Sequence, residues 1–205
     1  MEIRFTERGV EIERELNVVD RFALDFVQVL EATGVRYVII SGYIALLFGR
    51  SRSTEDVDMF LEPLGERRFE ALWERLCAAG FECINAPDSR SALHEYLEKG
   101  TALRFARPGT FDPNMELKFP RAAYNKYSLE HRLAIQVNGQ LLWTSELELQ
   151  IAFKLHLGSE KDLEDARHLY GILKERLDRA LLEQHIRALG VEKLAEEVLW
   201  PESRS

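Results

Sequence analysis

The sequence predicts an α+β fold, in which a mixed β-sheet flanked by helices is followed by a helical C-terminal portion. Stretches with the helical period and with the strand period alternate along the first part of the chain. The pair Asn138-Gly139, a strong signal for a two-residue hairpin turn, joins two short apolar stretches. From Ser145 onward only the helical period occurs. We therefore expect a core over residues 1–143 and a helical C-terminal subdomain over residues 144–205.

The first half of the core is expected to alternate between helices and short buried strands. Residues 17–33 place their apolar side chains on one stripe, which predicts a helix that ends at Gly34. Residues 36–41 are rich in β-branched and aromatic side chains, as is typical of a buried strand. The next expected elements are a short apolar helix over 43–49, a strand over 57–63, an amphipathic helix ending at Gly80, a strand over 81–85 and a helix over 91–100.

Two hairpins complete the expected sheet. The stretches 101–106 and 115–119 have the strand period and are separated by a turn-rich segment, so they are expected to pair with each other. The second hairpin turns at Asn138-Gly139. Ser145 and Glu148 have the spacing of a capping box at the start of a helix over residues 145–158. Two or three further helices are expected over residues 163–177 and 179–199.

Composition limits the class of protein. The 205 residues include 35 acidic and 27 basic side chains, and the net charge of −8 argues against coating nucleic acid through the overall field. Cys77 and Cys83 are too few for a disulfide framework and favour reduced thiols. The charged N-terminus does not resemble a signal peptide, and no apolar run approaches the roughly 18 residues of a membrane helix. We expect a cytoplasmic protein without a membrane partner.

The most informative motif is the pair Asp56 and Asp58. Because alternate side chains on a strand share a face, these two carboxylates are expected side by side, about 6–7 Å apart along a strand that rises about 3.3 Å per residue. Neighbouring carboxylates repel each other unless a cation lies between them. Mg²⁺ commonly fills this role, because it binds one or two carboxylates together with phosphate oxygens.

A second motif lies upstream of this pair. Ser41-Gly42 ends a strand and opens a short helix, where small residues let backbone N–H groups approach a phosphate. Arg50 and Arg52 in the following segment supply positive charge for a triphosphate or for the loop itself. Together the two motifs indicate a site for a nucleotide and a metal ion.

The stretch from residue 37 to residue 62 resembles the signature of the DNA polymerase β-like nucleotidyltransferase superfamily. That signature is a Gly-[Gly/Ser] pair after a strand, roughly ten further residues, and then Asp-h-[Asp/Glu]-h, where h is hydrophobic. This chain departs from it at the pair, which is Ser41-Gly42 or, shifted by one residue, Gly42-Tyr43. It is most similar to the AbiEii-type toxin nucleotidyltransferases, whose pattern it supplies with Gly42, Tyr43, Ala45, Gly49, Arg52, Thr54, Asp56 and Asp58.

The resemblance continues to about residue 170. Members carry a third carboxylate on a later strand, and Glu116 matches it, with Lys118 on the same strand face. They also carry a lysine on the first C-terminal helix and a Lys-Asp-x-x-Asp segment after it, which Lys154 and residues 161–165 match. An arginine that often precedes the Lys-Asp pair is absent, because residues 158–160 are Gly-Ser-Glu.

This resemblance implies an Mg²⁺- or Mn²⁺-dependent enzyme that moves a nucleoside monophosphate from an NTP, such as ATP, to a hydroxyl of RNA, of a protein or of a small molecule. It also suggests a toxin of a toxin–antitoxin pair, with an antitoxin as partner. Catalytic and metal-binding roles are implied for Asp56, Asp58 and Glu116. Nucleotide-binding roles are implied for Ser41, Gly42, Arg52, Thr54, Lys118, Lys154, Lys161 and Asp162. A local basic patch for a polyanionic acceptor is expected from Lys118, Arg121, Lys126 and Arg132.

Structural alternatives stay open at these positions. An Asp-x-Asp pair also occurs at solvated strand ends and turns, and Asp112 is an alternative to Glu116 as the third carboxylate. Acidic residues in a first helical turn, such as Asp162, are favoured by the helix dipole alone. Lys154 lies among apolar residues and could serve only packing. The alternative function is a non-catalytic module of the same fold that binds a nucleotide or a partner.

Overall fold

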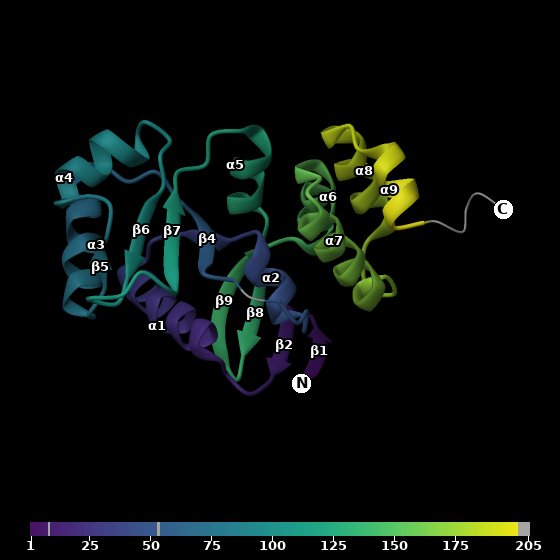
Figure 1. The fold of residues 1–205 in the computed structure, drawn as a ribbon, viewed down its shortest axis with the longest axis horizontal. Helices are drawn as coiled ribbons and strands as arrows, with labels where there is room; N and C mark the ends of the chain where they lie inside the picture. The colour runs from purple at the N-terminus through teal and green to yellow at the C-terminus, as the bar shows by residue number, and fades with distance from the viewer. Residues whose placement is uncertain (8, 53, 201–205) are drawn as a thin grey trace.

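The computed structural model describes residues 1–7, 9–52 and 54–200, and within them one mixed sheet forms the centre of the molecule (Figure 1). Its strand order is β1-β2-β8-β9-β3-β4-β7-β6-β5. The strands are β1 (Glu2–Thr6), β2 (Gly9–Glu13), β3 (Tyr37–Ile39), β4 (Asp56–Leu61), β5 (Glu82–Cys83), β6 (Leu103–Ala106), β7 (Asn114–Lys118), β8 (Arg132–Val137) and β9 (Gln140–Ser145). The helices are α1 (Val18–Thr33), α2 (Gly42–Leu47), α3 (Glu66–Ala78), α4 (Ser89–Ser91), the π-helix η1 (Ala92–Leu97), α5 (Ala123–Glu130), α6 (Leu147–Leu157), α7 (Glu160–Leu173), α8 (Arg179–Leu189) and α9 (Glu192–Val198). The predicted α+β fold is thus confirmed.

Both predicted hairpins form. Strands β6 and β7 pair antiparallel, with Leu103 opposite Leu117. Strands β8 and β9 pair antiparallel around Asn138 and Gly139, whose φ angles of 48° and 78° are the positive values that a type I′ turn requires. The sheet extends to Ser145, and the helices of the C-terminal part begin at Leu147.

Three local features differ from the sequence-based expectations. The predicted capping box at Ser145 is wrong, because Ser145 ends β9 and α6 follows Glu146 without a side-chain cap. Strands β1 and β2 form in the charged N-terminal stretch, where Val10 and Ile12 are nevertheless buried and β2 pairs with β8. Helix α5 was also not expected. It is only weakly amphipathic, and Ser128 and Leu129 are its buried residues while Tyr124, Asn125 and Tyr127 are partly buried.

One face of the sheet is covered by α1 and α3, and it holds most of the core. Val57, Met59 and Leu61 of β4 point to this side and are fully buried in the same cluster as the apolar side chains of the two helices. Aromatic rings join the layers, since Phe26 of α1 lies 5.9 Å from Phe105 of β6, centroid to centroid. Helix α1 starts at a capping box made by Asn17 and Asp20.

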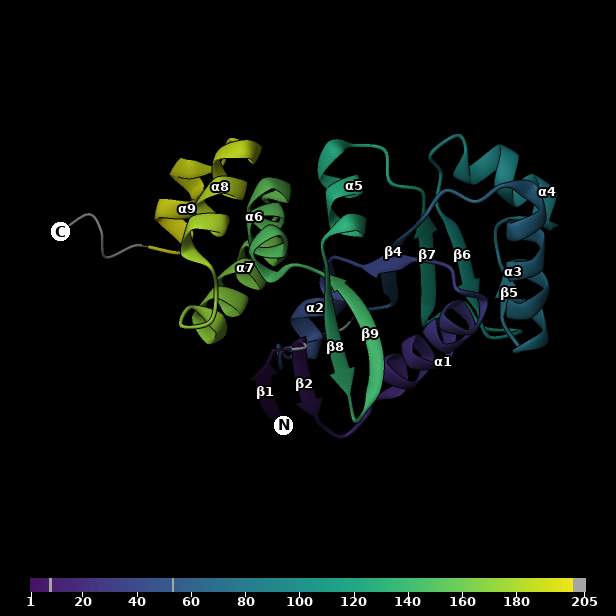
Figure 2. The ribbon, with the colours of Figure 1, turned by 180° about the vertical axis from the view of Figure 1, so that it is seen from behind.

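The opposite face of the sheet carries α5 over a smaller apolar cluster. Val38 of β3, Phe60 of β4 and Leu129 of α5 form it, with Ile40 packed against them. In both views α5 stands between the strands and the C-terminal helices α6 to α9 (Figures 1 and 2). Because alternate residues of β4 share a face, Asp56 and Asp58 lie on the α5 side, away from α1 and α3. Over residues 1–7, 9–52 and 54–200, no helix is both long and apolar enough to cross a bilayer.

Candidate active site

The predicted carboxylates come from two neighbouring parallel strands. β4 and β7 pair in a register that sets Asp56 beside Asn114, Asp58 beside Glu116 and Phe60 beside Lys118. Directly opposed residues on one sheet face have side chains in contact range, so Asp58 and Glu116 are immediate neighbours. Both are largely removed from solvent, with 19% of the Asp58 side chain and 9% of the Glu116 side chain exposed. Asp112, the alternative third carboxylate, lies before β7.

Two cations neutralise this pair. The Lys118 ammonium bridges Asp58 and Glu116, at 3.2 Å from Asp58 Oδ1 and 3.0 Å from Glu116 Oε2. Arg104, which β6 places opposite Glu116, donates from Nε and Nη2 to Glu116 Oε1 at 2.7 and 2.6 Å. Both oxygens of Glu116 therefore have a cationic partner. Asp56 has a different contact, because Thr54 Oγ1 lies 3.3 Å from its Oδ1 and donates to its backbone oxygen at 3.0 Å.

The two paired carboxyl groups are shifted in opposite directions. Burial raises the pKa of Asp58, and the charges of Asp56 and Glu116 raise it further, which outweighs the opposing effect of Lys118. Burial also acts to raise the pKa of Glu116, but the hydrogen bonds and charges of Lys118 and Arg104 lower it overall. The pKa of Lys118 is raised, because its two carboxylate partners outweigh its burial. Of the two carboxylates, Asp58 is thus the one whose ionised form is stabilised less by its surroundings.

The donor chemistry of this face fits a hard divalent cation. Asp56, Asp58 and Glu116 offer carboxylate oxygens on one sheet face, and carboxylate oxygens are ligands that hard divalent cations prefer. Across the described part of the chain, however, no three His, Cys, Asp or Glu side chains are already grouped to hold a metal ion. In the present arrangement the Lys118 ammonium lies where two of the three carboxylates meet.

The turn between β3 and α2 is held by a residue that the motifs did not indicate. Ser41 has φ 67° and ψ −139°, a backbone conformation that a residue with a Cβ rarely adopts. Gln150 of α6, which is 2% exposed, accepts from Ser41 N at 3.2 Å and donates to Ser41 O at 2.8 Å. Ser145 Oγ donates to the same Gln150 oxygen at 3.3 Å. The side-chain amide of Gln150 therefore links α6 to the strained turn and holds the backbone of Ser41 in place.

Arg52 lies directly over this turn. A Cβ on Gly42 would collide with the Arg52 guanidinium, so the absence of a side chain at position 42 is what makes room for it. Arg52 Nη1 donates to Asp165 Oδ2 at 2.9 Å. Its Nε is buried and makes no hydrogen bond to any residue in 1–7, 9–52 or 54–200. A buried donor without a partner is uncommon in folded proteins.

A buried ionic network connects Arg52 to the C-terminal helices. Asp165 of α7 is fully buried and is shared by Arg50, Arg52 and Lys154, whose Nζ lies 3.0 Å from Asp165 Oδ2. Lys154 itself is 2% exposed, so it does not reach out to solvent as a packing lysine would. It also pairs with Asp162, and although burial acts to raise the pKa of Asp162, hydrogen bonds from Lys154 and Ser159 lower it overall.

The predicted nucleotide-binding residues fall into three groups. The first group belongs to the turn or to the ionic network around Asp165 and consists of Ser41, Gly42, Arg52, Lys154 and Asp162. Lys118 lies among the carboxylates, and Thr54 supports Asp56. Lys161 is different, because its side chain is exposed and its carbonyl accepts from Arg50 Nη1 at 2.9 Å.

Three of the four residues of the expected basic patch have partners within the fold. Lys118 bridges two carboxylates, and Arg121 donates to the Glu98 carbonyl. Arg132 donates to the Tyr37 carbonyl at 3.2 Å and stacks over the Trp143 ring at 4.5 Å. Lys126, the fourth residue, is exposed on α5.

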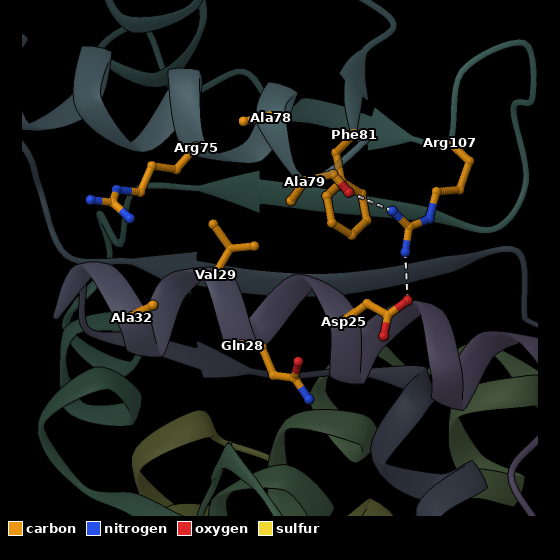
Figure 3. A pocket seen from close by; sticks show the side chains of 9 residues that line it. All are labelled: Asp25, Gln28, Val29, Ala32, Arg75, Ala78, Ala79, Phe81 and Arg107. Atoms are coloured by element: carbon orange, nitrogen blue, oxygen red, sulfur yellow. Dashed lines mark hydrogen bonds and ion pairs between the residues drawn. The ribbon is translucent and has the colours of Figure 1, made fainter.

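The open groove in Figure 3 lies elsewhere, on the face covered by α1 and α3, and encloses about 510 Å³. Its main polar side chain, Arg107, stacks over the Phe81 ring at 4.0 Å, pairs with Asp25 and donates to the Ala79 carbonyl at 2.9 Å. The charge of this arginine is thus already used within the fold. The groove is on the other side of the sheet from Asp58.

Comparisons with known proteins agree with this architecture. No protein-family model matches the sequence, and neither does any curated protein. Among solved structures, an antigenic nucleotidyltransferase-like protein from Paracoccidioides brasiliensis superimposes with a TM-score of 0.53 and 20% identity, covering 90% of this chain and 94% of that one. The chain has a nucleotidyltransferase-like fold.

Two structures of the antibiotic-resistance factor ANT(2″)-Ia have the same fold. One is a solution structure, with a TM-score of 0.50 and 15% identity, covering 87% of this chain and 96% of that one. The other is a complex with adenylyl-2″-tobramycin, with a TM-score of 0.51 and 14% identity, covering 83% of this chain and 95% of that one. At these identities the likeness concerns the fold alone.

Proposed function

We propose that the protein transfers a nucleoside monophosphate from an NTP to a hydroxyl acceptor at the sheet face that carries Asp56, Asp58 and Glu116. The observation that carries this proposal is the in-register pairing of Asp58 with Glu116 on parallel strands of a nucleotidyltransferase-like fold. The adjoining turn supports a nearby place for phosphate oxygens, because the Arg52 guanidinium lies over Gly42 and its Nε has no hydrogen-bond partner among the described residues.

In this proposal the carboxylates of Asp56, Asp58 and Glu116 would hold Mg²⁺ or Mn²⁺. Such ions neutralise the triphosphate and the pyrophosphate leaving group and make the attacking hydroxyl more acidic. Thr54 keeps Asp56 in place through its hydroxyl. Arg52 provides charge for the phosphates, while Gln150 holds the backbone of Ser41.

The network around Asp165 would serve to position these groups. Lys154 and Asp165 are buried, so in this proposal they do not contact the nucleotide directly and instead hold Arg52 in position. Asp162 holds the other side of Lys154. A direct nucleotide contact by Lys161, whose side chain is exposed, stays a prediction of the family resemblance.

We propose a small hydroxyl-bearing molecule as the acceptor class. The net charge is −8, and Arg121 and Arg132 are engaged within the fold, so little of the expected patch is left for a long polyanion. The ANT(2″)-Ia complex contains an adenylylated small molecule, which is a property of that protein and a precedent for this fold. An RNA end, a protein side chain and an antitoxin partner stay predictions of the resemblance.

The test is a transfer assay with NTPs labelled at the α-phosphate, Mg²⁺ or Mn²⁺, and panels of small hydroxylated molecules, RNAs and proteins. We expect a labelled adduct with the wild type and a loss of at least about 100-fold in Asp58→Asn, since a group that binds the metal is removed. Glu130→Gln, at an exposed position of α5, makes the same change of charge and is expected to keep full activity. An Asp58→Asn variant as active as Glu130→Gln would contradict the proposal.

A specific observation also favours the second candidate, a non-catalytic binding module. Lys118 and Arg104 already neutralise Glu116, so this face can be stable without any metal ion. Such a module predicts a nucleotide-dependent rise in melting temperature that needs no metal, together with no transfer to any acceptor. Stabilisation by nucleotide only when Mg²⁺ is present would instead favour the enzyme.

A further inference from the structure

The carboxylate face carries its own cation. Lys118 ends β7, and its ammonium is the group that joins Asp58 to Glu116 across the two strands. Its position follows from the register, since Lys118 lies two residues beyond Glu116 on the same face and beside Phe60 of β4. The contact is therefore built into the sheet and does not depend on a mobile loop.

The lysine satisfies the carboxylates unequally. Glu116 has Arg104 as a second partner, whereas Asp58 receives its only salt bridge within residues 1–7, 9–52 and 54–200 from Lys118. Loss of Lys118 would leave Glu116 paired and Asp58 beside two other carboxylates without a cation. A buried carboxylate in that position attracts any positive charge that can reach it.

The lysine can also leave. About 35% of its side chain is exposed, compared with 9% for Glu116, so the lysine borders solvent more than the carboxylate that it pairs with. A divalent cation offers these carboxylates twice the charge of an ammonium. The two cations therefore compete for the same oxygens.

We propose that Lys118 is an internal counter-ion that occupies Asp58 and Glu116 in the metal-free protein, weakens divalent-cation binding by competition, and is released toward the anionic substrate once the cation binds. This inference rests on the proposed function for the identity of the substrate as a nucleoside triphosphate. The competition itself concerns only the cation and the residues of this chain.

Two opposite effects follow for a variant without the charge. Lys118→Gln binds the cation more tightly, by about tenfold, because one positive charge within a few ångströms no longer opposes it. With the cation at saturation, the same variant binds ATP more weakly, because the released ammonium is missing. If Lys118 had only a structural role, its removal would instead weaken both cation binding and ATP binding.

The experiment measures free Mn²⁺ by its electron paramagnetic resonance signal in titrations of wild type, Lys118→Gln, Lys118→Arg and Lys126→Gln. Lys126→Gln, at an exposed position of α5, has the same change of net charge as Lys118→Gln and is expected to match the wild type. Lys118→Arg keeps the charge, so its Mn²⁺ affinity is expected to stay near that of the wild type. This result would show that the change in Lys118→Gln comes from the lost charge. ATP binding at saturating Mn²⁺ is then measured on all four proteins.

Melting in EDTA provides a second readout without activity. We expect Lys118→Gln to melt below the wild type in EDTA and to recover most of the difference when Mn²⁺ is added. A deficit that is equal with and without Mn²⁺ would indicate a purely structural lysine and would overturn the proposal.

The outcomes separate this inference from the proposed function. If wild type binds Mn²⁺ and Lys118→Gln binds it no more tightly than Lys126→Gln does, the counter-ion inference fails and the proposed enzyme stands. If only Lys118→Gln binds Mn²⁺, the inference holds and the metal-dependent function of the wild type fails. If neither binds Mn²⁺, both fail.

Discussion

Asp165→Asn is expected to be one of the most damaging single substitutions near the site. The Asp165 carboxylate is fully buried and shared by Arg50, Arg52 and Lys154, whose side chains are 13%, 11% and 2% exposed. Asparagine has nearly the same shape, so the change removes charge and leaves the packing in place. It leaves three cations around a neutral amide.

The magnitude follows from what each cation retains. Arg50 keeps Glu164, and Lys154 keeps Asp162. Arg52 has no second carboxylate partner among the residues that the structure describes. Breaking a buried ion pair by removing one partner costs about 3–5 kcal/mol. Because two of the three cations keep a partner, we expect the free energy of unfolding to fall by about 3 kcal/mol, the lower end of this range.

Urea unfolding followed by circular dichroism measures this loss. The matched control is Glu164→Gln, since Glu164 pairs with Arg50 but its side chain is 52% exposed, where a salt bridge contributes at most about 1 kcal/mol. Asp165→Asn should also weaken ATP binding in the presence of Mg²⁺, because Arg52 is no longer held over Gly42. If Asp165→Asn is as stable as Glu164→Gln, the buried carboxylate of Asp165 does not stabilise the fold through its three cations.

Two further predictions concern the carboxylates and the turn. Burial and neighbouring negative charges raise the pKa of Asp58 in the folded protein above its ordinary 3.8. The metal-free wild type therefore loses stability as pH rises through the raised pKa, because Asp58 must then ionise in the fold. In urea unfolding with EDTA, the stability of Asp58→Asn relative to wild type should be greater at pH 7 than at pH 4. A constant difference between the two pH values would contradict the raised pKa. Ser41→Gly removes backbone strain at φ 67° and should stabilise by about 1 kcal/mol, whereas Gln150→Met removes two hydrogen bonds to Ser41 and should cost about 2 kcal/mol in the same measurement. A loss of stability in Ser41→Gly would show that the turn is not strained.

Sequence reasoning could predict what depends on local spacing. The shared face of Asp56 and Asp58 follows from strand alternation, and the hairpin at Asn138-Gly139 follows from turn chemistry. The fold followed from the order of these elements. Each of these features depends on residues that are close together in the chain.

The pairing across the site depends on long-range register and could not be predicted in the same way. Glu116 lies beside Asp58 because β4 and β7 pair in parallel, and nothing near either residue specifies that register. Arg104 and Gln150 are parts of the site for the same reason. Gln150 gave a weak signal, since a lone amide at a buried position of an apolar helix needs a polar partner.

The charged N-terminal strands and α5 were missed for another reason. β1 and β2 alternate apolar and charged residues over only five residues each, and β2 is stabilised by pairing with β8 more than 100 residues away. α5 has little amphipathic pattern, and it is held by tertiary contacts such as those of Leu129 with Val38 and Phe60 and of the Tyr124 ring with the Phe153 ring. In both cases tertiary contacts, and not local propensity, decide the structure.

The most direct test of the central claim is whether pyrophosphate release from ATP depends on both Mg²⁺ and the Asp58 carboxylate. Purified wild type, incubated with ATP, Mg²⁺ and an accepting hydroxyl compound, is predicted to release pyrophosphate in equal amount to the adenylylated product, and Asp58→Asn to release essentially none. Equal release from wild type and Asp58→Asn, or release without any adduct under all conditions, would contradict nucleotidyl transfer at this face.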